Sequence, residues 1–185
     1  MITRLWITGY RSFELGIFNK NDKKIEVLSM FLKRRIEQYQ LDGLEWVITG
    51  AQLGIEQITI NTVANIKEND THLKNAVMLP FKDFGANWNE NNTLNFKSSL
   101  NKSNYVNYVS NEDYQSPQQL KNWQQFMLNH TDGLLIIYDP EKEGKPNFDY
   151  LAAIDFAKNH NYSIELVTFE DLEDFTRELA DEEIN

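Results

Sequence analysis

Short runs of strand-forming residues alternate six times with longer runs of helical periodicity along this chain of 185 residues. Parallel strands need long crossover connections, and helices usually supply them. The pattern therefore predicts an α/β fold, a three-layer Rossmann-like open sheet that is mainly parallel and has helices on both faces. The predicted strands are 5–8, 44–49, 76–79, 105–109, 133–138 and 163–168, and the predicted helices are 22–42, 55–68, 91–102, 117–129, 150–159 and an acidic terminal helix.

The acidic residues are concentrated in one terminal segment. The whole chain carries a net charge of −10, but residues 165–185 alone hold nine acidic residues and one basic residue. The first 164 residues are nearly balanced, at −2. We expect a single domain over 1–185 with an acidic C-terminal segment at 170–185. Binding of extended nucleic acid needs a basic surface, so it is not expected, while a mononucleotide-sized ligand stays possible.

Several classes of site are disfavoured by composition. The chain has no cysteine and three scattered histidines, so no disulfide, thiol nucleophile or metal site is predicted. No cofactor is predicted. The longest apolar run, 134–138, is far shorter than a membrane helix, and the N-terminus has no signal-peptide pattern. The expected location is the cytoplasm, without a membrane partner.

Glycines follow the second predicted strand. The segment TGAQLG, residues 49–54, runs directly into a helix, where Gly50 and Gly54 permit close backbone approach and the free N–H groups of the helix start attract anions. This pattern favours a phosphate site. Its spacing is neither G-x-G-x-x-G nor the Walker pattern, and a tight strand-to-helix turn explains the same glycines.

Other candidate ligand-binding residues also follow predicted strands, where open parallel sheets bind ligands. Arg11 is a candidate for phosphate or carboxylate binding, or alternatively for a surface ion pair with Glu14. Trp88 is a candidate for stacking on a ring, or alternatively for anchoring its loop. The complete predicted ligand site is Thr8, Gly9, Tyr10, Arg11, Gly50, Gln52, Gly54, Glu56, Trp88, Asp139 and Gly144.

Two carboxylates, Glu56 and Asp139, are the candidates for catalysis. Glu56 could bind a sugar or base, or act as an acid or base, but the helix dipole also favours an acid at this position. Asp139 opens the loop DPEKEGKP, which could close over a ligand or be an ordinary solvent-facing turn.

Four motifs carry a resemblance to a known family. They are TGYRSFELGIF at 8–18, LEWVITGAQLGIE at 44–56, NAVMLPF at 75–81 and TDGLLIIYDPEKEGKP at 131–146. Together they resemble the YpsA family of the SLOG superfamily, which also includes the DprA proteins and the LOG phosphoribohydrolases. The resemblance implies a Rossmann-like fold, a nucleotide or nucleotide-derived ligand and, by analogy, a homo-oligomer.

The catalytic residues of the LOG enzymes are not retained. Their Pro-Gly-Gly-x-Gly-Thr motif keeps only Pro140 and Gly144 here, and its glutamate would fall near Asn147 or Phe148. Their Arg-Lys pair would fall on Trp123 and Gln124. We therefore predict binding of a nucleotide-derived small molecule, in sensing or regulation. The alternatives are a hydrolase of an N-glycosidic or phosphate bond, and a protein-interaction adaptor that uses the acidic segment.

Overall fold

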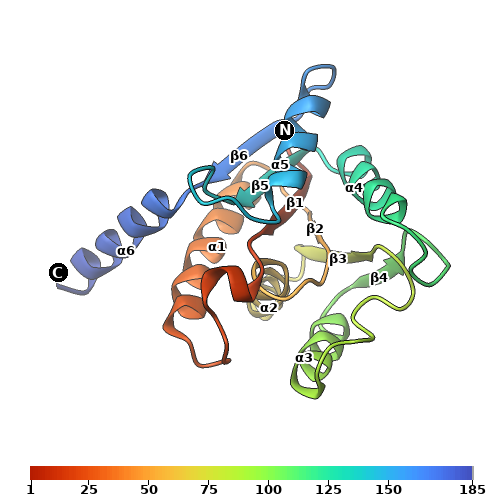
Figure 1. Cartoon of the computed structure of the whole chain (residues 1–185). Coiled ribbons are helices and arrows are strands. Elements are labelled where there is room, and N and C mark those ends of the chain that lie inside the picture. Colours follow the sequence, from red (N-terminus) through yellow and green to blue (C-terminus); the bar gives the residue numbers. More distant parts are fainter. Residues whose placement is uncertain (185) are drawn as a thin grey trace.

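The computed structural model, in which residues 1–184 are described, contains one six-stranded parallel sheet (Figure 1). The strand order is β4-β3-β2-β1-β5-β6, so the chain builds outward from β1 in one direction and then resumes on its other side. The strands are β1 (Arg4–Gly9), β2 (Trp46–Thr49), β3 (Lys74–Leu79), β4 (Tyr105–Tyr108), β5 (Gly133–Ile137) and β6 (Ser163–Val167).

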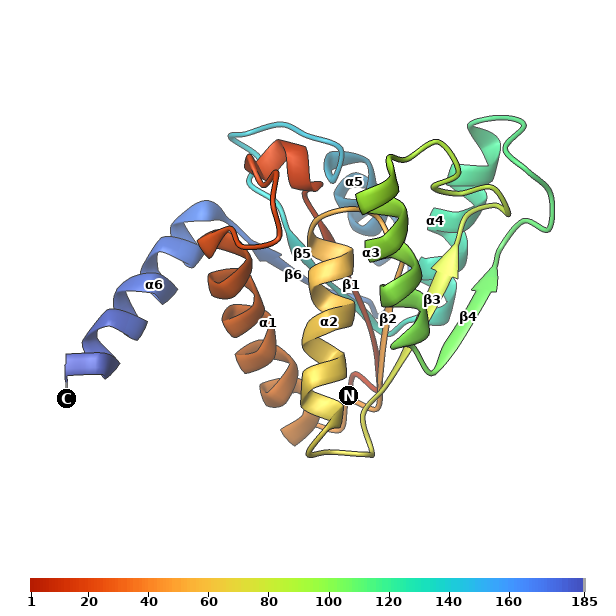
Figure 2. The same cartoon turned by 90° about the horizontal axis from the view of Figure 1, so that it is seen from below.

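Helices cover the two faces of the sheet. Figure 2 shows α1, α2 and α3 in front of the sheet and α4 and α5 behind it. The helices are α1 (Lys23–Leu41), α2 (Ile55–Lys67), α3 (Glu90–Asn101), α4 (Gln118–His130), α5 (Asn147–Ala157) and α6 (Phe169–Ile184). The predicted three-layer Rossmann-like arrangement is confirmed, and every strand pairing is parallel.

The alternation of side chains along β1 explains why apolar residues are buried on both faces of the sheet. Leu5 and Ile7 point to one face and pack with α1, α2 and α6, whereas Trp6 points to the other and packs with α4. Trp6 is fully buried and meets Trp123 edge to face, with ring centroids 5.7 Å apart. Successive residues of a strand face opposite ways, so a strand such as β1, which has apolar side chains on both faces, must be covered on both sides.

The acidic terminal segment forms a docked helix. Phe175 of α6 is 6% exposed and packs edge to face on Phe31 of α1. Arg34 of α1 bonds to Glu178 and Glu182 across the same contact. The acidic charges of α6 therefore lie beside a buried apolar stripe that attaches the helix to α1.

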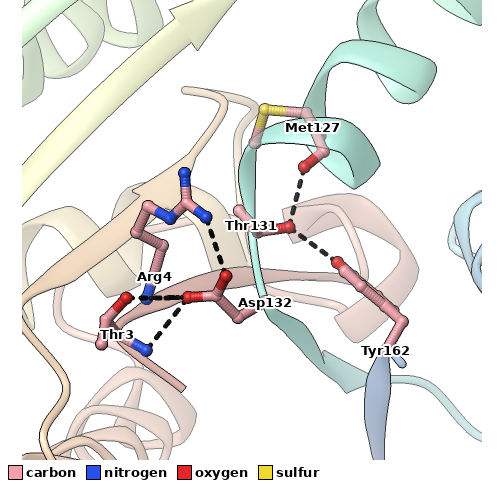
Figure 3. A network of polar contacts seen from close by, with 6 residues as sticks. All are labelled: Thr3, Arg4, Met127, Thr131, Asp132 and Tyr162. Atoms are coloured by element: carbon pink, nitrogen blue, oxygen red, sulfur yellow. Dashed lines mark hydrogen bonds and ion pairs between the residues drawn. The ribbon is translucent and has the colours of Figure 1, made fainter. Parts of the chain in front are cut away.

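A polar network fastens the amino ends of β1 and β5 (Figure 3). The carboxylate of Asp132 accepts hydrogen bonds from the backbone N–H groups of Thr3 and Arg4 and from both of their side chains. Burial alone would raise the pKa of Asp132, but these bonds from Arg4 and Thr3 outweigh it and lower the pKa to about 2. Nearby, Thr131 donates to the carbonyl of Met127 and also bonds to the hydroxyl of Tyr162.

Two local features differ from the sequence-based prediction. The predicted helix 150–159 is α5, which begins three residues earlier, at Asn147. A short 3-10 helix, η1 (Ser12–Leu15), follows β1 and was not predicted. Both differences lie at the carboxyl edge of the sheet and change which side chains meet there.

No helix within residues 1–184 is long and apolar enough to cross a membrane.

Candidate functional site

The carboxyl ends of β1, β2 and β5 form the place where this fold would hold a ligand. The chain leaves β1 toward β2 on one side, and β5 pairs with β1 on the other. In open α/β sheets the connections diverge at such a point and leave a crevice above the strand ends. The segments Thr8–Ser12, Thr49–Glu56 and Tyr138–Asp149 all gather at this edge.

The turn after β1, which begins at Gly9, packs directly against the turn between β2 and α2, which ends at Gly54. The backbone of Tyr10 accepts a hydrogen bond from the N–H of Ile55, and Ser12 donates to the carbonyl of Leu53. Gly54 has a φ of 107°, and a Cβ there would lie 2.5 Å from the carbonyl oxygen of Tyr10. A Cβ on Gly9 would lie 2.7 Å from the carbonyl oxygen of Ile137. Close packing within the protein therefore accounts for both glycines.

The carboxyl of Glu56 occupies the turn between β2 and α2, where the glycine pattern had predicted a phosphate. Its side chain is 6% exposed and accepts hydrogen bonds from the backbone N–H of Gln52, at 2.8 Å, and from the hydroxyl of Thr8, at 2.9 Å. Gly50 leaves room for this carboxyl, because a Cβ there would collide with the Oε2 atom of Glu56. Burial raises the pKa of Glu56, while the bonds from Gln52 and Thr8 and the charge of Arg11 oppose the rise.

Asp149 supplies a second carboxyl that the sequence reading missed. It lies in the first turn of α5, is partly buried, and accepts a hydrogen bond of 2.7 Å from the side-chain amide of Gln124. Burial and then the negative charge of Glu56 raise the pKa of Asp149 to about 7, against the lowering effects of Gln124 and Arg11. The predicted helix start at 150 excluded Asp149, whereas a start at the Lys145-Pro146 pair would have revealed it.

Arg11 is the cation of this site. The pKa values of Glu56 and Asp149 are both raised by burial, and the positive charge of Arg11 opposes the rise at each carboxyl. Among residues 1–184, however, its side chain makes no hydrogen bond and no ion pair, and its backbone N–H donates to Glu14. The alternative role for Arg11, an ion pair with Glu14, is not the arrangement seen. Arg11 therefore remains available to a ligand.

Tyr10, Asp139 and Gly144 form the closed side of the site. The hydroxyl of Tyr10 bonds to the backbone of Asp139 and of Lys142, and its ring stacks on Phe169 with centroids 5.3 Å apart. The carboxylate of Asp139 accepts from the backbone N–H groups of Glu141 and Phe169. These contacts are those of a turn that holds the loop in place, and a ligand contact by these residues stays a prediction.

Gly144 is held in the same closed loop. A Cβ at this position would lie 2.6 Å from the Oε1 atom of Glu14. That oxygen accepts the N–H of Lys145 at 2.7 Å, so the loop needs glycine to approach η1. The loop and η1 therefore fix each other beside β1.

Trp88 lies in a separate aromatic cluster. Its ring packs edge to face on Phe84 and Phe96, with centroids 5.3 and 5.4 Å away, beneath the turn at Gly85. These are the contacts of a loop anchor between β3 and α3. The ring partners of Trp88 are Phe84 and Phe96, which do not belong to the Glu56 site. Stacking of Trp88 on a ligand stays a prediction.

An apolar groove lies on the other side of Tyr10. It has a volume of about 800 Å³ and opens between η1, α1 and α6. Its apolar lining is formed by Phe13, Leu15, Val27, Leu28, Phe169 and Leu172, and it includes neither Arg11, Glu56 nor Asp149. The Glu56 site is the stronger ligand site of the two, because convergent polar groups give a ligand its orientation.

The candidate site contains carboxyls but no cluster suited to a metal. No group of three or more histidine, aspartate or glutamate side chains in the described part of the chain, 1–184, is arranged to hold a metal ion. The groups present are two carboxyls, one guanidinium, a hydroxyl and an amide, from Glu56, Asp149, Arg11, Thr8 and Gln124. Such a set can bind hydroxyl groups and one anionic group of an organic molecule.

Comparison with known proteins places the chain in a family. The family model for YpsA, described as the YspA SLOG family, matches residues 5–172. A UPF0398 protein of Ligilactobacillus salivarius is 48% identical over 171 residues, which cover 92% of this chain and 93% of that protein. A UPF0398 protein of Oenococcus oeni is 46% identical over 184 residues, covering 98% of each chain. This protein therefore belongs to the YpsA family of SLOG proteins.

Proposed function

We propose that this protein binds a nucleotide-derived small molecule at the carboxyl ends of β1, β2 and β5. The observation that carries the proposal is the pair of carboxyls Glu56 and Asp149, which Thr8 and Gln124 hold at this edge of the sheet and on which the charge of Arg11 acts. Isolating charged groups from water is costly, so proteins keep such groups mainly where they have a task. Their position at the reversal of strand order supports a ligand-binding task.

The carboxyls and the guanidinium would bind different parts of the ligand. Carboxyl oxygens accept hydrogen bonds from vicinal hydroxyls, so Glu56 and Asp149 suit a ribose. The guanidinium of Arg11 presents a planar fork that suits a phosphate oxygen pair. Because the site has two acids and one cation, we expect a ligand with few phosphates.

A role in sensing or regulation is favoured over turnover by two residues. Trp123, at the expected place of a LOG arginine, is buried and donates its indole N–H to the carbonyl of Met78. Gln124, at the place of the lysine, is neutral and holds Asp149. The strongest phosphate-binding side chains of the LOG enzymes are therefore replaced by core and positioning residues.

Calorimetric titration with nucleosides, nucleotides and nucleotide sugars tests the proposal. Arg11→Ala should weaken a phosphate-bearing ligand by about tenfold or more and leave the matching nucleoside unaffected. Glu56→Gln should weaken both, with circular dichroism used to confirm that each variant is folded. Arg177→Ala, which changes an exposed side chain of α6, is the matched control and should bind as the wild type does. The proposal fails if no compound binds, or if the Arg11 and Arg177 variants behave alike.

A second candidate function is hydrolysis of an N-glycosidic bond. It is favoured by the pKa of about 7 for Asp149, which lets this carboxyl exchange a proton at neutral pH. Asp149 would protonate the departing base nitrogen as the C1′–N bond breaks. Water would add its oxygen to C1′ and give a proton to Glu56, and the positive charge that develops on the sugar would be stabilised by the carboxylates.

Product analysis separates the two candidates. Incubation with a nucleotide pool followed by chromatography should show free base and a sugar phosphate if hydrolysis occurs. The rate should depend on pH with an inflection near 7, and Asp149→Asn should abolish it, while Asp155→Asn on the same helix should not. An unchanged pool that nevertheless binds would leave binding alone as the function.

A further inference from the structure

The groove between η1, α1 and α6 is separate from the Glu56 site and has the size of a ligand pocket. Its volume of about 800 Å³ lies within the roughly 300 to 1,000 Å³ of small-molecule sites. Leu28 is buried in its wall, whereas Phe13 on η1 is 60% exposed. A molecule in the groove would therefore cover an aromatic ring that the protein itself leaves in water.

Some of the charged groups of the groove are already engaged within the protein. Three lysines and three glutamates line it, Lys23, Lys24, Lys142, Glu14, Glu143 and Glu173. The two carboxylate oxygens of Glu14 accept the backbone N–H groups of Arg11 and Lys145. Lys24 is paired with Asp22 at 3.8 Å. Glu14 and Lys24 therefore have partners before any ligand arrives.

The remaining charges favour an anionic ligand. Burial and then the charge of Glu143 raise the pKa of Tyr138, a residue of the core beneath α4 and α5, so this carboxylate acts toward the other face of the sheet. In the part of the chain that the structure describes, Lys23 and Lys142 make no ion pair, and of the lining acids Glu173 remains to oppose them. Two cations against one acid suit a molecule with a single acidic group.

The rings beside the groove favour a ligand with a flat apolar body. Tyr10 and Phe169 are stacked, with ring planes 5° apart and centroids 5.3 Å apart. The ammonium of Lys142 lies 4.8 Å from the centroid of Phe169, so a cation is held at the surface of this ring system. Aromatic rings pack well on further rings, and an ammonium binds an anion by charge-assisted hydrogen bonds. An aromatic acid satisfies both features.

Tyr10 belongs both to the groove and to the turn that carries Glu56. Its ring lines the groove, while its backbone carbonyl accepts the N–H of Ile55 at 3.1 Å, one residue before Glu56. Its hydroxyl bonds to the backbone of Asp139 and Lys142, in the loop that leads to α5. A ligand that fixes the ring of Tyr10 therefore also fixes the start of α2.

We propose that the groove is an effector site, which binds an organic acid with a flat aromatic body and thereby strengthens ligand binding at the Glu56 site. The effect on the Glu56 site rests on the proposed function, whereas binding in the groove does not. Ordering a turn costs conformational entropy, and a second ligand that needs the same turn no longer meets that cost. The two sites are therefore positively linked, and the link is reciprocal.

A pair of fluorescent dyes tests the choice of ligand. 8-Anilinonaphthalene-1-sulfonate has a flat aromatic body and one acidic group, and N-phenyl-1-naphthylamine has the same body without the acid. Fluorescence titration should show that the sulfonate binds about tenfold tighter or more. The double variant Lys23→Gln, Lys142→Gln should remove that difference. Lys33→Gln, which changes an exposed lysine of α1, is the matched control and should preserve it.

A pair of aromatic substitutions tests the position of the dye. Phe13→Ser should weaken both dyes by about tenfold, because this ring supplies apolar contact at the rim of the groove. Phe18→Ser is the matched control, since Phe18 is 82% exposed and does not line the groove. Both rings are exposed, so neither substitution leaves a cavity in the core, and circular dichroism should confirm that both variants are folded.

The link to the Glu56 site can be measured without any nucleotide. Hydrogen exchange of the Ile55 N–H, followed by NMR, reports on its bond to the carbonyl of Tyr10. Saturating sulfonate dye should slow this exchange about fivefold or more, and Phe13→Ser should cancel the effect at the same dye concentration. The N–H of Asn104, which bonds to the carbonyl of Asn75 at the opposite edge of the sheet, should not change. A nucleotide that binds at the Glu56 site should bind about fivefold tighter or more in the presence of the dye.

Several results would overturn the proposal. Equal affinity for the two dyes would show that the groove does not select an acid, and equal losses in the Phe13 and Phe18 variants would place the dye elsewhere. An unchanged exchange rate at Ile55, or a nucleotide affinity that the dye does not alter, would show that the groove is not linked to the Glu56 site. If no nucleotide binds but the dye slows exchange at Ile55, the proposed function fails while the link between the groove and the turn stands.

Discussion

The carboxyls of Glu56 and Asp149 come from opposite faces of the sheet and interact at its carboxyl edge, although they belong to α2 and α5. The hydroxyl of Thr8 holds the first, and the amide of Gln124 holds the second. Burial and the charge of Glu56 raise the pKa of Asp149 to about 7. This arrangement has a measurable cost in stability as well as a proposed function.

Asp149→Asn should stabilise the protein at high pH. In the unfolded chain an aspartate has a pKa of about 3.9, so folding favours the protonated form of Asp149. Its contribution to stability is complete below about pH 4 and is lost as the pH rises through about 7. The neutral variant should gain about 2 kcal/mol in free energy of unfolding at pH 8 and little at pH 4, measured by urea denaturation. Asp155→Asn, which changes an exposed side chain, should show no such pH dependence. An equal gain in stability at pH 4 and pH 8 would show that the pKa of Asp149 is not raised in the folded protein.

Asp132→Asn should have the opposite dependence on pH. The folded pKa of about 2 lies below the unfolded value, so Asp132 stabilises the protein above about pH 4, and this contribution is lost as the pH falls through about 2. We expect a loss of about 2 kcal/mol at pH 7, shrinking toward zero near pH 2. Thermal melting at several pH values measures the loss. Glu37→Gln, an exposed change on α1, is the control, and a loss that did not vary with pH would exclude this explanation.

Gly54→Ala and Gly16→Ala should differ strongly, although both glycines have a positive φ. A Cβ added at Gly16 would lie in open space, 3.7 Å from the Nζ atom of Lys24, so only backbone strain of about 1 kcal/mol is expected. A Cβ added at Gly54 would in addition collide with backbone atoms of Tyr10, Arg11 and Ser12. Denaturant unfolding should show a loss of more than about 3 kcal/mol, or no folded protein. Similar losses for the two variants would show that the two turns do not pack as described.

Phe175→Ala should destabilise the protein far more than removal of an acidic charge from α6. Phe175 is almost fully buried against Phe31, so its truncation leaves a cavity and should cost about 3 kcal/mol. Glu182→Gln removes only an exposed ion pair to Arg34 and should have little effect on the melting temperature. If the two substitutions had equal effects, α6 would be held by charge and not by packing.

Local sequence patterns were sufficient to predict the order and type of the elements. The cap at Asp22, the glycine after α1 and the Ser116-Pro117 start of α4 are short-range signals, and the helices begin or end beside them. The apolar run at 133–138 predicted β5 because a central strand is covered on both faces. Boundaries were less certain, and the error of three residues at the start of α5 left out Asp149.

The candidate site was only partly accessible from the sequence. Positions after strands were correctly expected to meet at one edge, and this brought Thr8, Arg11 and Glu56 together. The same positional rule could not distinguish a ligand contact from an internal one. Tyr10, Asp139 and Gly144 follow strands too, but their partners are the neighbouring loop and η1.

The sequence by itself determined an alternating α/β chain, its parallel sheet and the separation of an acidic terminal helix from a nearly neutral body, because periodicity and charge are local properties. Only the tertiary structure decided that Glu56 occupies the turn at Gly50, that its charge raises the pKa of Asp149, and that Phe148 and Leu151 remain exposed. These facts depend on which distant segments pack together. Burial, pKa and exposure are set by neighbours in space, so no pattern within one segment could specify them.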